Sequence, residues 1–132
     1  MTKAIFTAFL GMFFMGCALF SSKLTLENSS WALISISNES INIQKTPVIR
    51  FLDKKAAGFN GVNNFNANYE VSNGKIIFSD MISTRMAALS PELSKLETDF
   101  TNTLLNVVSF ESNGDILTIR GADNTLIFKR AK

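Results

Sequence analysis

The sequence predicts an α+β domain, mainly β, with an antiparallel half-barrel sheet of about seven to eight strands covered by one amphipathic helix. Three observations predict this class. Short segments alternate apolar and polar residues, two Asn-Gly pairs separate such segments, and one stretch, residues 91–106, has helical periodicity. Alternation with a period of two places one face of a strand on the core and the other in water, which suits an antiparallel sheet covered on one side.

The clearest strand is residues 64–71, where Phe65, Ala67, Tyr69 and Val71 alternate with polar side chains. Other short runs carry the β-branched, aromatic and aliphatic residues that are common in strands. These runs are residues 31–36, 41–43, 48–52, 76–78, 107–110, 116–119 and 125–128.

Turn residues connect several of these strands. The pairs Asn73-Gly74 and Asn113-Gly114 tolerate the positive φ angles of a type I′ hairpin turn, and residues 122–125 form a weaker turn signal. The sequence therefore predicts three antiparallel hairpins. They cover residues 69–78, 107–119 and 116–128.

The predicted helix begins with an N-cap serine, a proline at the first helical position and an acid in the first turn, at Ser90, Pro91 and Glu92. An apolar stripe with helical spacing follows, and it predicts that one face packs across the open side of the sheet. The stripe consists of Leu93, Leu96, Phe100, Leu104 and Val107.

The composition excludes several kinds of chemistry. The 132 residues contain no His and one Cys, and the formal net charge is +2. There is thus no imidazole base, no His-ligated metal site and no internal disulfide, and the charge favours no binding of nucleic acid. The acidic residues form no recognisable catalytic pair. We therefore expect no enzyme activity, no catalytic residues, no cofactor and no metal.

The N-terminus has the features of an export signal. Lys3 precedes an uncharged, apolar run at residues 4–15, which is too short to span a bilayer comfortably. Residues 14–17, Phe-Met-Gly-Cys, resemble a bacterial lipobox, although that motif usually has Leu where this chain has Phe14. The resemblance implies a signal peptide at residues 1–16, lipidation of Cys17, and a tether at residues 17–29 before a domain at residues 30–132.

Two other interpretations of this segment remain open: an ordinary signal peptide with a chance cysteine, and a buried N-terminal helix. By resemblance to the common sorting rule, Ala18 after the cysteine implies a lipid anchor in the outer membrane, with the protein facing the periplasm. The expected location is the bacterial cell envelope.

Several segments, in their order and spacing, resemble the META domain family of HslJ-like bacterial lipoproteins. They are Trp31-Ala-Leu, Phe51, residues 58–65 and residues 83–87. Two motifs of that family, Gly-Cys-Asn-x-Phe and Thr-Arg-Met-Ala-Cys, match at Gly61, Asn63, Phe65, Thr84, Arg85 and Met86. Val62 and Ala88 stand where both motifs have cysteine, so the resemblance implies that this chain lacks a disulfide and that the two residues are neighbours.

The matched residues are interpreted as mainly structural, with alternatives. The Gly- and Asn-rich residues 58–64 form either a backbone nest for an anion or a tight connection between strands. Arg85 either recognises a ligand or pairs with a nearby acid. A third set lines an apolar groove or fills an ordinary core: Phe59, Phe65, Phe78, Leu96 and Phe100.

The resemblance implies a non-enzymatic, monomeric envelope lipoprotein that supports outer-membrane integrity, or tolerance of heat and antibiotics, through a protein partner. One alternative is a pilotin-like carrier or sensor of a lipid or other apolar ligand that assists secretion assembly. Another is a periplasmic inhibitor of a cell-wall hydrolase.

Overall fold

The computed structural model describes residues 26–131, which form one helix and one sheet. The predictions for the signal peptide at residues 1–16 and for Cys17 lie outside these residues. The elements, in chain order, are β1 (Ser29–Ile36), β2 (Glu39–Ser40), β3 (Val48–Phe51), β4 (Lys55–Phe59), β5 (Asn64–Ser72), β6 (Lys75–Ser83), α1 (Pro91–Leu105), β7 (Val107–Asn113), β8 (Ile116–Gly121) and β9 (Thr125–Arg130).

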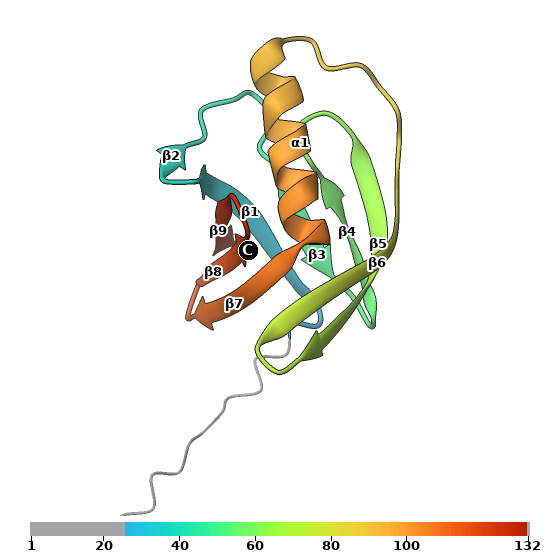
Figure 1. Ribbon diagram of the computed structural model, residues 1–132, viewed down its shortest axis with the longest axis vertical. Coiled ribbons are helices and arrows are strands. Elements are labelled where there is room, and N and C mark those ends of the chain that lie inside the picture. Colours follow the sequence, from blue (N-terminus) through green and yellow to red (C-terminus); the bar gives the residue numbers. More distant parts are fainter. Residues whose placement is uncertain (1–25, 132) are drawn as a thin grey trace, which may run out of the picture.

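The sheet is antiparallel throughout and curls around the helix (Figure 1). Its strand order is β6-β5-β4-β3-β1-β9-β8-β7, and the short β2 pairs with β1. The two edge strands approach each other at one end, where the backbone N–H of Phe110 donates to the carbonyl of Gly74 at 3.2 Å. Helix α1 contacts β6, β8 and β9 and covers the open side. The predicted fold class is confirmed.

The three predicted hairpins are confirmed. They are β5–β6, β7–β8 and β8–β9, whose innermost pairs are Ser72 with Lys75, Asn113 with Ile116, and Arg120 with Thr125. Asn73 and Gly74 both have positive φ, at 51° and 73°, as a type I′ turn requires.

The structure differs from the predicted elements in three places. Residues 41–43 are not a strand, and β2 occupies Glu39–Ser40 instead. The helix ends at Leu105, because Asn106 has non-helical backbone angles, so Val107 does not belong to the helical stripe and instead begins β7, in agreement with the strand predicted at residues 107–110. Strand β4 is not among the predicted elements, because its segment Lys-Ala-Ala-Gly-Phe lacks β-branched residues, but it pairs with β3 on one side and β5 on the other.

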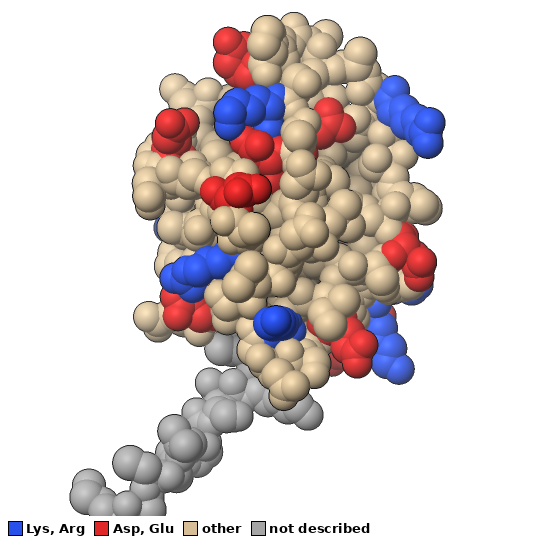
Figure 2. All heavy atoms as spheres, in the orientation of Figure 1, with Lys and Arg blue, Asp and Glu red and all other residues tan. Residues whose placement is uncertain are grey.

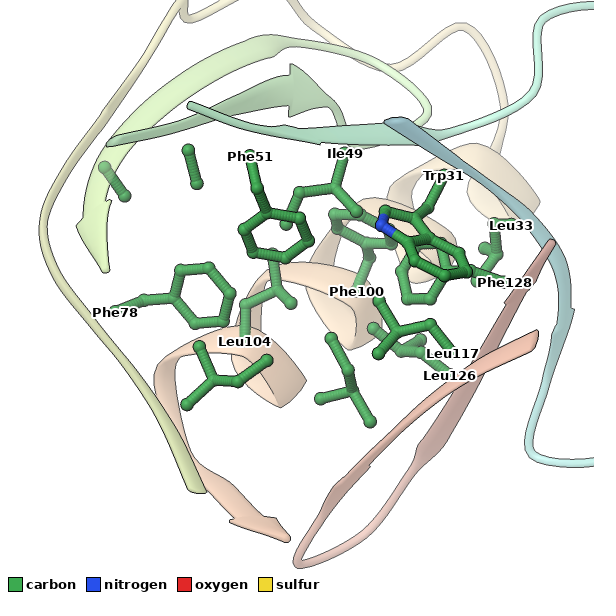
Figure 3. Close-up of a cluster of buried hydrophobic side chains, with 14 of the residues drawn as sticks. Trp31, Leu33, Ile49, Phe51, Phe78, Phe100, Leu104, Leu117, Leu126 and Phe128 are labelled. Carbon is green, nitrogen blue, oxygen red and sulfur yellow. The ribbon is translucent and has the colours of Figure 1, made fainter. Parts of the chain in front are cut away.

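The core lies between the concave face of the sheet and the helix (Figure 3). Phe100 of α1 is fully buried, and its ring centroid lies 5.9 Å from that of Phe65 and 6.0 Å from that of Phe128. Trp31 and Phe51, also fully buried, enter the same cluster from β1 and β3. A single aromatic cluster thus joins the helix to both halves of the sheet.

Residues just before the predicted boundary at residue 30 also contribute to the core. Leu26 is buried, and Ser29 opens β1, where it pairs with Phe51. The indole Nε1 of Trp31 donates to Oγ of Ser29 at 2.8 Å, so this segment supports the core. Across residues 26–131, no helix combines the length and the apolar character needed to cross a membrane.

Candidate functional site

A groove of about 690 Å³ lies beside the first turn of α1. Four segments form it: the loop between β2 and β3, the β4–β5 connection, the segment between β6 and α1, and the start of α1 itself. Its surface is mostly apolar. The lining residues are Asn42, Ile43, Gln44, Lys45, Phe59, Gly61, Val62, Asn64, Thr84, Met86, Ala87, Leu89, Ser90, Glu92 and Leu93.

The β4–β5 connection forms the floor of the groove and depends on a buried amide. Oδ1 of Asn60 accepts hydrogen bonds from the backbone N–H groups of Val62, at 3.0 Å, and Asn63, at 2.7 Å. Gly61 has a φ of +106°, and a Cβ atom there would lie 3.0 Å from Cδ2 of Leu96. The connection is therefore a tight turn that requires glycine. The Asn60 side chain thus already accepts from two of the N–H groups that an anion nest would use, which favours the tight-connection alternative.

The side chain of Asn63 joins this turn to the segment before the helix. Its Oδ1 accepts from the backbone N–H of Met86 at 2.7 Å and from Oγ1 of Thr84 at 2.9 Å. Its Nδ2 donates to the carbonyl of Met86 at 3.1 Å and to Oε1 of Glu97 at 2.8 Å. Asn63 is only 3% exposed, so these bonds satisfy a carboxamide that has almost no contact with water.

The remaining matched residues have different surroundings. Phe65 is buried, and its ring lies against the bare backbone of Gly58, where a Cβ would come within 2.9 Å of the ring. Arg85 is exposed, and none of the ion pairs found among residues 26–131 includes it. Of the two residues predicted to stand in place of cysteines, Val62 lines the groove, and the neighbours of Ala88 in sequence, Ala87 and Leu89, line it too.

The set predicted either to line a groove or to fill the core is divided. Phe59 lines the groove. The other four, Phe65, Phe78, Leu96 and Phe100, are buried in the core. The groove interpretation is therefore wrong for these four residues, because the helix covers the concave face closely and fills the interior of the sheet. The groove lies at the end of the helix instead.

Most residues that line the groove are not among those predicted from the sequence. Leu89 and Met86 are 95% and 69% exposed. Both belong to the uncharged segment at residues 86–89, directly before the helix cap. That run is a signal that sequence inspection could have used, since large exposed apolar side chains close together often mark binding surfaces. Ile43 and Lys45, which also line the groove, come from a loop that is distant in sequence, and no local sequence pattern predicts that they line it.

Charges around the groove are few. Among the described residues that line it, Lys45 is the one cation, and its Nζ lies 4.2 Å from the ring centroid of Phe59, in cation–π geometry. Glu92 is the one acid among the same residues. Positive and negative side chains are interspersed on the face that Figure 2 shows, and neither sign gathers into a continuous patch. Within residues 26–131, no three acidic or sulfur ligands lie close enough together to hold a metal. The arrangement suits binding of an apolar group.

The family model named META domain matches residues 24–132, so the chain belongs to the META domain family. It is similar to "Heat shock protein HslJ" of Escherichia coli (strain K12), with 25% identity over 107 residues, which cover 80% of this chain and 76% of that protein.

Two solved structures share the fold. The first, a protein whose structure was determined by NMR, has a TM-score of 0.69 and 24% identity, over 79% of this chain and 90% of the other. The second, an NMR structure of a protein from Burkholderia xenovorans, has a TM-score of 0.67 and 20% identity, over 81% of this chain and 84% of the other.

Proposed function

We propose that this protein is a non-enzymatic lipoprotein of the bacterial cell envelope, anchored through Cys17, which supports outer-membrane integrity under heat or antibiotic stress by binding a partner. The observation that carries the proposal is the META domain match over residues 24–132, to which the similarity to a heat shock protein adds the link to stress. The signal-like residues 1–17 support the location.

The position of the groove is consistent with partner binding. The start of the coloured chain, which leads into β1, and the beginning of α1 lie at opposite ends of the domain (Figure 1). If Cys17 carries a lipid anchor, we expect the groove to face away from the membrane. There the exposed Met86 and Leu89 offer apolar surface to a protein in the periplasm.

Deletion of the gene tests the role, with survival of heat and of antibiotics as the measurement. We expect the deletion strain to be sensitive to heat and antibiotics, and the wild-type chain to restore tolerance of both. Leu89→Ser, in the groove, should fail to restore it, whereas Ile77→Ser, which removes an exposed side chain of β6 away from the groove, should succeed. A deletion strain as tolerant as its parent would contradict the proposal.

The anchor needs its own test. We expect Cys17→Ala to abolish incorporation of an alkyne-labelled fatty acid and to release the protein from the membrane fraction. A Cys17→Ala protein that stays in the membrane fraction would contradict the lipid anchor, although a partner-binding role in the envelope would remain.

A second function, a carrier or sensor of an apolar ligand, is favoured by the groove. Its volume of about 690 Å³ lies within the usual range for small-molecule sites, about 300–1,000 Å³. Native mass spectrometry of the protein purified from envelopes tests this: a bound small molecule that disappears in Leu89→Ser supports a carrier, and a ligand-free spectrum for the wild-type protein counts against it.

A further inference from the structure

We infer that the groove binds a single-chain amphiphile with an anionic headgroup, its chain lying on the apolar walls and its headgroup beside Lys45. This inference rests on the second proposed function, the carrier, and names the class of ligand. It depends on three features of the groove: the walls, the cation and the rigid floor.

The walls offer one continuous apolar surface drawn from four parts of the chain. Ile43 comes from the β2–β3 loop, Phe59 from β4, Met86 and Leu89 from the segment before the helix, and Leu93 from α1. Leu89 is 95% exposed and Met86 69% exposed, so nothing in the described structure covers the outer part of this surface. An alkyl chain would remove these side chains from water without requiring any hydrogen-bond partner.

The charge at the groove favours an anion. Lys45 stands over Phe59 at 4.2 Å, which holds its ammonium group against an apolar wall. The ion pairs among residues 26–131 join other cations, namely Lys95, Arg120 and Arg130. Lys45 thus meets no carboxylate within ion-pair distance in the described part of the chain. A headgroup with negative charge would supply that partner.

Glu92 is the charge that opposes this orientation. It lies in the first turn of α1, where the positive end of the helix dipole partly offsets its carboxylate. The groove therefore has two charges of opposite sign, and each makes a separate prediction. Removing Lys45 should weaken binding of an anion, and removing Glu92 should strengthen it.

The floor of the groove is already formed without a ligand. Asn60 and Asn63 fix the β4–β5 turn and the segment around Met86 through hydrogen bonds of 2.7–3.1 Å. A ligand would thus bind a shape that is held in place, and little ordering of the backbone would oppose binding.

Calorimetric titration of the purified protein with three probes of equal chain length tests the inference: dodecanoate, dodecanol and dodecylammonium. We expect dodecanoate to bind most tightly and dodecylammonium most weakly. Lys45→Gln should weaken dodecanoate binding about two- to fivefold, the effect of one exposed charge pair, and leave dodecanol unchanged. Glu92→Gln should strengthen dodecanoate binding by a similar factor.

Matched variants control for folding and for general charge. Lys95→Gln removes an exposed cation of α1, which also carries Glu92. Lys95 pairs with Asp99 and does not line the groove, so this variant should leave all three affinities unchanged. Leu89→Ser should weaken all three probes. Emission of the single tryptophan, Trp31, shows whether each variant is folded.

Two sources of such a ligand exist, free fatty acids and lysophospholipids. Titration with dodecanoyl lysophosphatidylglycerol distinguishes them: tighter binding than dodecanoate assigns a lysophospholipid, and weaker binding assigns a fatty acid. Equal affinity for the three dodecyl probes, no effect of Lys45→Gln, or no binding of any probe would overturn the inference. None of these results would affect the envelope role, which depends on the deletion phenotype.

Discussion

The buried carboxamide of Asn63 donates a hydrogen bond of 2.8 Å to Oε1 of Glu97, 34 residues further along the chain. The same carboxamide also bonds both backbone groups of Met86. One side chain therefore ties a turn, a connecting segment and the helix together. Asn63 and the segment Thr84-Arg85-Met86, which are distant in sequence, thus form one hydrogen-bonded unit.

We expect Asn63→Asp to lower the free energy of unfolding by about 1–3 kcal/mol, because the new carboxylate cannot donate to Glu97 and instead repels it. Urea unfolding at neutral pH measures the loss. The double variant Asn63→Asp, Glu97→Gln should recover part of it, since the glutamine amide can donate to the new carboxylate. A double variant less stable than Asn63→Asp alone would contradict this account.

Gly58 is required for a different reason, close approach of the backbone. A Cβ at this position would lie 2.1 Å from the carbonyl oxygen of Val48 and 2.9 Å from the ring of Phe65. We expect Gly58→Ala to cost about 3 kcal/mol in thermal or urea unfolding, because the backbone of β3 would have to move. Gly114→Ala is the control: its Cβ meets nothing within 4 Å, and only its φ of +61° costs about 1 kcal/mol.

The guanidinium of Arg130 lies over the indole of Trp31, at 4.4 Å from the ring centroid. We expect Arg130→Gln to lower stability by about 0.5–1 kcal/mol and to change the fluorescence of Trp31, the only tryptophan of the chain. Arg120→Gln, which breaks an exposed pair with Glu111, should leave the emission unchanged. Identical spectra for Arg130→Gln and the wild type would contradict the contact.

Burial raises the pKa of Tyr69, and the negative charges of Glu27 and Asp53 raise it further. Its hydroxyl also donates to the carbonyl of Leu52 at 3.0 Å. Because the folded state favours the protonated phenol, its contribution to stability is complete below the unfolded pKa of about 10 and is lost as the pH rises through the higher folded value.

Tyr69→Phe should therefore show a shallower loss of stability above pH ~10 than the wild type. Tyr69 is the only tyrosine, so an ultraviolet titration reports its ionisation directly. An ordinary titration midpoint in the folded protein would argue against the shift.

Val62 and Ala88 remain predicted neighbours. We expect Val62→Cys, Ala88→Cys in a Cys17→Ser background to form a disulfide on oxidation and to gain about 2–4 kcal/mol in stability. Each single cysteine variant serves as the control and should show neither change. Free thiols in the oxidised double variant would contradict the prediction that these two positions are neighbours.

Local patterns predict much of this fold and little of its site. Alternation in residues 64–71, the Asn-Gly turns and the cap at Ser90 each act over a few residues, so they can be interpreted without the rest of the chain. Strand β4 escapes such analysis because Ala56, Ala57 and Gly58 owe their strand conformation to pairing with β3 and β5 and to the ring of Phe65. The strand conformation of these residues is therefore determined by their tertiary contacts and not by their intrinsic β-propensity.

The groove is hidden from sequence for a related reason. Lys45 and Phe59 belong to different elements, and only the packing of four segments brings them to one place. Phe65 and Phe100 suggest a groove equally well by composition, yet packing of the helix against the sheet buries both. Whether an aromatic side chain is exposed depends on what covers it, which alternation and spacing do not encode.

The pairing of β1 with β9 determines when the sheet can be completed during synthesis of the chain. Residues 31–36 bond residues 126–130, so the first strand has one free edge until the last strand has been synthesised. Long-range pairings of this kind also slow folding. A nascent chain thus cannot complete this sheet before residues 126–130 have been synthesised, although hairpins such as β5–β6 can pair earlier.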